Sequence, residues 1–263
     1  MPVDPDSTWL NRSLINDVIL QPQFYIPFFS SLTANLAWYR LAEKWLLPFI
    51  YGGACVTASS SSSNANKNSS DETRLQKAKS WVSTVFSSQI LILGGIPIAI
   101  EFLLLDKNET TADLVLRDSS YSWGLGAFFI GFLCADCILG CTSYPKQFNL
   151  LTGWIHHSAY ACVVFWLICR GQIGVFMPCV SFAEASTFLL ALGSVNSKWR
   201  TDLGFGVSFF LGRILIQTLV VFYALKTYTG YFWVAPAVPL PLHVHWFYKW
   251  SVGYFSAKKK KTV

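Results

Sequence analysis

The residues of this chain best suited to chemistry are ionisable side chains that interrupt long apolar stretches. They are Asp136, His156, His157, Glu184 and Arg213. An imidazole titrates near neutral pH and can move a proton, and a neighbouring carboxylate can orient it. Arg213 stays charged at any ordinary pH and needs an anionic partner. We therefore expect one of the two carboxylates to pair with Arg213 and the other to contact a histidine, with Glu184 as the residue that fixes the histidine tautomer.

Each of these residues also has a purely structural interpretation. Ionisable side chains inside a membrane cost several kcal/mol unless they are paired or wetted, so they mark functional sites by default. The same groups can form ion pairs that only hold helices together. The sequence favours a polar layer that performs catalysis or binds a lipid headgroup, and it leaves helix–helix ion pairing open.

The composition places this layer within a membrane. Of the 263 residues, 53% are hydrophobic and only 13% are charged, which is about half the charged fraction of an ordinary soluble domain. This excludes a soluble domain, a disordered chain and a coiled coil. A spanning helix needs ~20 mostly apolar residues. We therefore expect an all-α, polytopic transmembrane helix bundle with six to seven spans.

Seven apolar stretches are candidates for these spans. They cover roughly 30–58, 81–105, 121–143, 150–169, 173–193, 203–226 and 232–254. The middle five are the strongest. Arg40, Glu43 and Lys44 interrupt the first, which is either an amphipathic stretch leading into a short span or one long helix with snorkelling charges. The prolines of 236–241 should kink or break the last stretch.

Helix geometry places the ionisable residues at a common level. With a rise of ~1.5 Å per residue, they lie ~9 to ~15 Å below the same membrane face, on four different spans. His156 and His157 point about 100° apart. His156 shares its helix face with Gly153 and Tyr160, and glycine allows a second helix to approach closely.

Lys and Arg are unevenly distributed between the two sets of loops. The richer set holds Lys67, Arg74, Lys77, Lys79, Lys146, Lys198, Arg200 and Lys258 to Lys261, and the poorer set holds Arg12, Lys107, Arg117, Arg170 and Lys226. The richer side should be cytosolic, which puts the N-terminus in the lumen and the C-terminus in the cytosol. Asn11 and Asn108 are then weak lumenal glycosylation sites, and the Asn68 sequon should stay unmodified.

The C-terminus carries an address signal in this topology. Lys260 and Lys261 occupy the fourth and third positions from the end, as in dilysine signals that a coat-type receptor uses for retrieval to the endoplasmic reticulum. The alternative is a basic tail held by anionic lipid headgroups. We expect a multi-pass protein of the endoplasmic reticulum membrane.

Three short motifs together resemble a known family. They are Trp154-Ile155-His156-His157-Ser158, then Phe182-Ala183-Glu184-Ala185-Ser186-Thr187 followed by Asn196 to Arg200, and finally Arg213. With Lys79 to Val85, these stretches resemble the TLC domain family, which includes translocation-associated membrane proteins, Lag-type ceramide synthases and a lysosomal-storage-disease protein. The resemblance implies an N-terminal lumenal segment, weak first span and Ser-rich linker over 1–74, a TLC-like transmembrane domain over 75–252 and a basic tail over 253–263.

Ceramide synthases of this family join a long-chain base to an acyl group from acyl-CoA. Their motif has a Thr where this chain has Tyr160, and a His-Asp pair where it has Ala183-Glu184. The sequence therefore looks closer to the non-synthase branch, whose members bear on membrane lipid composition. We expect a protein that binds or regulates membrane lipids, an acyl chain or a sphingoid base. The alternative is a ceramide-synthase-like N-acyltransferase, with acyl-CoA as its conditional cofactor.

In either case His156, His157 and Glu184 are the candidate catalytic residues, and Asp136, Tyr160 and Arg213 are the candidate ligand-binding residues. No metal is expected, because the helical spacing of Cys134, Cys137 and Cys141 is more typical of packing. His243 and His245 are expected at the membrane interface beside Trp246. The chain contains no nucleic-acid module, and cytosolic loops and tail account for its net charge of +6.

Overall fold

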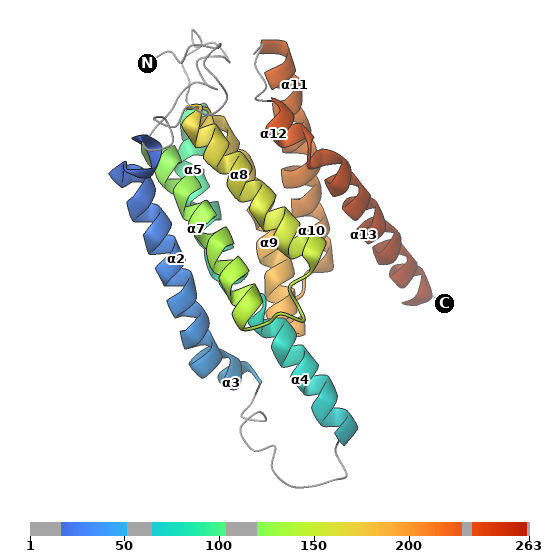
Figure 1. The fold of residues 1–263 in the computed structure, drawn as a ribbon. Coiled ribbons are helices and arrows are strands. Elements are labelled where there is room, and N and C mark those ends of the chain that lie inside the picture. The colour runs from blue at the N-terminus through green and yellow to red at the C-terminus, as the bar shows by residue number, and fades with distance from the viewer. Residues whose placement is uncertain (1–16, 52–64, 104–119, 228–232, 262–263) are drawn as a thin grey trace.

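The computed structural model describes residues 17–51, 65–103, 120–227 and 233–261 (Figure 1). Within these ranges the chain forms helices joined by short connections, with no strand. The expected all-α architecture is confirmed. Five helical stretches are long and apolar enough to cross a membrane: Glu72–Ile100, Ser120–Thr142, Leu150–Cys169, Phe176–Val195 and Asp202–Phe222. They overlap the five middle stretches chosen from hydropathy, although the first begins at Glu72 rather than near residue 81.

The helices follow one another in simple order along the chain. They are α2 (Pro22–Leu41) continuing through a π-helix (Ala42–Leu46) into α3 (Leu47–Ile50), α4 (Ala65–Lys79), α5 (Val82–Leu103), α7 (Ser120–Thr142), a π-helix (Leu150–Ile155) leading into α8 (His156–Cys169), α9 (Ile173–Val195), α10 (Asp202–Phe209) continuing through a π-helix (Phe210–Ile216) into α11 (Gln217–Thr227), α12 (Val234–Ala237) and α13 (Leu240–Lys261). Successive long helices run alternately up and down (Figure 1). Residues counted from the same end of neighbouring helices therefore reach the same level.

The first stretch differs from its expected bounds. Helix α2 begins at Pro22 rather than near residue 30, and the helix continues without a break to Ile50. Two of the three charges that interrupt the pattern, Arg40 and Glu43, are paired. The Nζ atom of Lys79 lies 2.8 Å from Glu43 Oε1, and the Nη1 atom of Arg40 lies 3.2 Å from Glu43 Oε2. Of the two interpretations, the described residues favour one long helix whose charges lie at its end.

The last stretch is broken where its prolines lie. Helix α12 ends at Ala237, and α13 starts at Leu240 with Pro241 in its first turn, where a missing backbone N–H costs nothing. Helix α13 then diverges from the bundle towards its C-terminal end (Figure 1). Neither α2 nor α13 is among the five membrane-spanning candidates.

Helix α2 is nevertheless part of the central core, because it packs along α7 and α5. The Ser87 hydroxyl of α5 donates to Asn35 Oδ1 at 2.7 Å, and both residues are buried. At Gly131 of α7 the two backbones come so close that an added Cβ would collide with the Phe28 carbonyl oxygen. It would also lie 2.9 Å from Ser31 Cβ. Only glycine permits this approach.

Replacing Gly131 with alanine should therefore separate α2 from α7. We expect Gly131→Ala to lower the free energy of unfolding by about 1–3 kcal/mol, the usual cost of overpacking a core, in a denaturation of the detergent-solubilised protein. Gly253→Ala is the matched control, since a Cβ there meets nothing within 4 Å. Equal stability of the two variants would contradict the close approach of α2 to α7.

Candidate functional site

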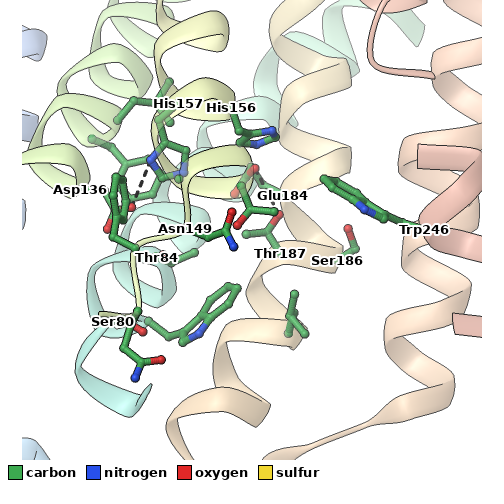
Figure 2. A pocket seen from close by; sticks show the side chains of 18 of the residues that line it. Ser80, Thr84, Asp136, Asn149, His156, His157, Glu184, Ser186, Thr187 and Trp246 are labelled. Atoms are coloured by element: carbon green, nitrogen blue, oxygen red, sulfur yellow. Dashed lines mark hydrogen bonds and ion pairs between the residues drawn. The ribbon is translucent and has the colours of Figure 1, made fainter. Parts of the chain in front are cut away.

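A cavity of about 370 Å³ lies between α5, α7, α8, α9, α10 and α13 (Figure 2). All five ionisable residues singled out from the sequence line it: Asp136, His156, His157, Glu184 and Arg213. The two carboxylate residues and the arginine are only 5%, 7% and 8% exposed. We call this cavity the polar chamber. Four separate helical segments thus bring these groups together around one cavity.

His157 and Asp136 form one half of the polar chamber. The His157 Nδ1 atom lies 3.1 Å from Asp136 Oδ2 (Figure 2), although it is not aligned for a hydrogen bond. The Tyr144 hydroxyl donates to the other oxygen of Asp136. Burial and the Asp136 charge both raise the pKa of Tyr144, so the phenol stays protonated and keeps donating. Asp136 is thus held in place beside an imidazole.

Glu184 and Arg213 form the other half. The Ser88 hydroxyl donates to Glu184 Oε2 at 2.7 Å, and Thr187 donates to Oε1 at 3.3 Å. The Arg213 Nη2 atom lies 3.7 Å from Glu184 Oε1 and donates to Thr187 Oγ1 at 2.6 Å. The Nε atom of Arg213 donates to Ser186 Oγ at 3.1 Å. The expected division of the two carboxylates between a histidine and the arginine is present.

One expected role is wrong. Glu184 was the residue expected to fix a histidine tautomer, but the carboxylate beside a histidine is Asp136, and Glu184 is engaged with Arg213. The level of a residue follows from its position along a helix, whereas its partner depends on the rotation of that helix about its axis. Sequence spacing does not give that rotation between separate helices.

His243 is a site residue that the sequence analysis misplaced. It is buried rather than at the interface, and its Nε2 atom lies 3.0 Å from Arg213 Nη1. Because arginine only donates, Nε2 accepts and Nδ1 carries the proton. Nδ1 then donates to Gln217 Oε1 at 2.8 Å, and Gln217 Nε2 donates to the Pro236 carbonyl. The only signal in the sequence was a histidine within a proline-rich apolar stretch.

His156 lines the polar chamber, and its ring contacts Tyr160, which lines the two neighbouring cavities but not the chamber. The two rings lie 4.6 Å apart, centroid to centroid, and the His156 ring lies 5.6 Å from that of His157 and 6.5 Å from that of Trp246. Figure 2 shows the His156 and Trp246 rings facing each other across the chamber. Both imidazoles thus have aromatic neighbours, and His157, which lies near Phe132 and Phe148, also has the Asp136 carboxylate beside it.

Two π-helices set the directions of these side chains. One spans Leu150–Ile155, immediately before His156, and starts at Asn149, whose side chain accepts from Leu151 N at 2.8 Å. The other spans Phe210–Ile216 and contains Arg213. π-Helical turns are rare and occur frequently at functional sites. At Gly212 an added Cβ would lie 2.5 Å from the Phe182 carbonyl oxygen, so this glycine allows Arg213 to approach α9.

A second cavity, of about 490 Å³, lies beside the polar chamber and is almost wholly apolar. We call it the apolar groove. It is lined by Leu151, Ile155, His156, Ala159, Tyr160, Val163 and Trp166 on one side, Phe176 at one end, and Val234, Ala235, Val238, Pro239 and Leu242 on the other side. A small cavity of about 50 Å³ between the two is lined by His156, Tyr160, Arg213 and His243. His156 borders all three cavities.

Other candidate residues lie away from these cavities or outside the described ranges. Among the residues described, no group of three His, Cys, Asp or Glu side chains could hold a metal ion, and Cys134, Cys137 and Cys141 are free thiols. Asn11 and Asn108 lie outside the described residues. Lys260 and Lys261 are the last two residues of α13.

The Arg213–Glu184 contact predicts strong energetic coupling. Arg213→Met should lower the free energy of unfolding by about 3–5 kcal/mol, because it leaves a carboxylate buried without its cation. Combining it with Glu184→Gln should recover part of that loss in the same detergent denaturation. Arg200→Met is the control, since Arg200 and Asp202 form an exposed ion pair at 2.6 Å and should cost below ~1 kcal/mol. Simple additivity of the two chamber substitutions would contradict the pairing.

Comparisons with known proteins return no match to this chain from any family model, curated protein or solved structure. What the protein does must therefore be inferred from its own residues.

Proposed function

We propose that this protein is a lipid-binding or lipid-regulating membrane protein that holds a headgroup in the polar chamber and a hydrocarbon chain in the apolar groove. The observation that carries this proposal is the position of His156, which borders both cavities. One amphipathic molecule can therefore occupy the two cavities at once. The polar end is rich in hydrogen-bonding groups, and the other end offers almost none.

The charges of the polar chamber favour an amine or hydroxyl headgroup over a phosphate. Asp136 and Glu184 carry two negative charges and Arg213 carries one positive charge, which leaves one excess negative charge when the histidines are neutral. Arg213 is already surrounded by Glu184, Ser186, Thr187 and His243. An anionic headgroup would meet repulsion from Asp136, whereas a cationic one would be attracted. A sphingoid base has this chemistry.

The resemblance to the TLC domain family supports the same proposal, because the residues that carry it, His156, His157, Glu184 and Arg213, all line the polar chamber. We place the protein in the endoplasmic reticulum on the strength of Lys260 and Lys261 at the end of α13. In this proposal α2 and α13 also cross the membrane, which gives seven spans, a lumenal N-terminus and a cytosolic C-terminus.

Photolabelling tests the lipid proposal directly. A long-chain amine with a diazirine in its chain, added to the protein in phosphatidylcholine vesicles, should label residues of the apolar groove. Ala159→Trp fills the groove and should lower labelling ~10-fold or more, because the indole takes the volume that the lipid chain would occupy.

Leu219→Trp is the matched control for that experiment. Leu219 lies on α11 with 45% of its surface exposed, so a larger side chain there faces the surroundings and should leave labelling unchanged. Equal labelling of both variants, or labels spread over exposed helix faces of the wild type, would overturn the lipid-binding proposal.

One observation favours a second candidate function, a ceramide-synthase-like N-acyltransferase. His157 lies against a carboxylate that is itself held by Tyr144, an arrangement that suits a general base. In that reaction the amine nitrogen attacks the thioester carbonyl of acyl-CoA, and the imidazole takes the amine proton. The carbon–sulfur bond then breaks, and the departing thiolate recovers the proton as the amide forms.

The two functions give different results with the purified protein. An acyltransferase should convert a labelled long-chain base and acyl-CoA to amide, and His157→Ala should lower the rate by about 10²- to 10⁴-fold. His156→Ala should also lower it, because that ring lies at the junction of the cavities. His245→Ala, an exposed position on α13, should not. Absence of product together with retained lipid binding would leave the first function alone.

A further inference from the structure

We infer that Trp166 and Phe176 close the far end of the apolar groove and thereby limit the length of the lipid chain that the protein accepts. This inference rests on the proposed lipid-binding function. It adds a specificity determinant in the apolar groove, outside the polar chamber. The argument begins with the direction in which the groove runs.

The groove runs along α8 on both sides of His156, and its longer arm leads away from the polar chamber to Trp166. Its lining residues on that side, Leu151, Ile155, Ala159, Val163 and Trp166, repeat every three or four positions, which is the spacing of a single helix face. From His156, at the polar chamber, to Trp166 the helix rises by ~15 Å. A chain with its headgroup in the chamber therefore lies alongside α8 and points towards Trp166.

The far end is closed by aromatic rings. Phe176, near the start of α9, is only 4% exposed and belongs to the main hydrophobic cluster. Trp166 is packed against the same cluster. A ring fixed by close packing does not move aside without cost. A chain that reaches these rings can lengthen only by leaving the groove. Each further methylene then makes no contact with the groove walls.

Val163 provides an independent test of the length of the groove. It lies on the groove face three positions before Trp166, so a larger side chain there should end the groove earlier. Trp166→Ala should act in the opposite direction, because it removes the ring at the end. The two substitutions on one helix face should thus shift the limiting chain length in opposite directions. A general loss of stability would not produce opposite shifts.

The experiment measures competition against the diazirine amine by a homologous series of saturated long-chain amines in phosphatidylcholine vesicles. For the wild type, competition at equal mole fraction in the bilayer should be similar for all chains that fit the groove, because lipid tails are as apolar as its walls. It should fall ~10-fold or more beyond a limiting length, because a longer chain must bend or leave the groove. Trp166→Ala should move that limit to longer chains, and Val163→Phe should move it to shorter ones.

Trp123→Ala is the matched control, since Trp123 packs against the same hydrophobic cluster but does not line the groove, and its limit should equal that of the wild type. If Trp166→Ala does not fold, Val163→Phe still decides the question. The same limiting length in wild type and Val163→Phe, or no limiting length in the wild type, would overturn the inference alone. No competition by any chain in the wild type would overturn both the inference and the proposed function.

Discussion

The arrangement of the polar chamber depends on one constraint, the permanent charge of Arg213 inside an apolar helix. A guanidinium presents its donors in a fixed planar fork, and here its three nitrogens reach two elements, α9 and α13. Nε and Nη2 donate to Ser186 and Thr187 of α9, and Nη1 donates to His243 of α13. Satisfying this one side chain therefore joins the π-helix of Phe210–Ile216 to α9 and α13. Glu184 supplies the compensating charge from the same face of α9.

Hydropathy predicts the helix bounds closely where the thickness of the membrane alone sets the length of a helix. The helix Ser120–Thr142 and the stretch Leu150–Cys169 match the apolar runs at 121–143 and 150–169, because the thickness of the bilayer sets their length. Helix α2 looks only weakly apolar in the sequence for a physical reason. Ser31 and Asn35 lower the hydropathy of that stretch, yet both are fully buried, and Asn35 accepts a hydrogen bond from Ser87. Buried polar side chains that bond across helices look like surface residues in a sequence.

The sequence predicted which ionisable residues lie close together in the candidate site, but not which of them pair with one another. Rise per residue places Asp136 and Glu184 at one height, and both line the polar chamber. Which of them contacts His157 depends on how the helices are rotated, and π-helices change that rotation. A π-turn adds a residue to one turn, so the residues after Leu150–Ile155 face a different direction than an α-helix would give them. The position of His243 was also not predictable from spacing, because its contact with Arg213 depends on the break between α12 and α13.

The two cavities must contribute differently to the recognition of a lipid. Helix α13 is held to the bundle by His243 and by the packing of Trp250 on Phe205, whereas the apolar groove separates α12 and the start of α13 from α8. Inside a membrane, any hydrocarbon chain can fill such a groove, because lipid tails are as apolar as its walls. The groove can therefore select a chain by length but not by chemistry. Chemical discrimination has to come from the polar chamber, where exchanging one headgroup for another leaves Asp136 either paired or repelled.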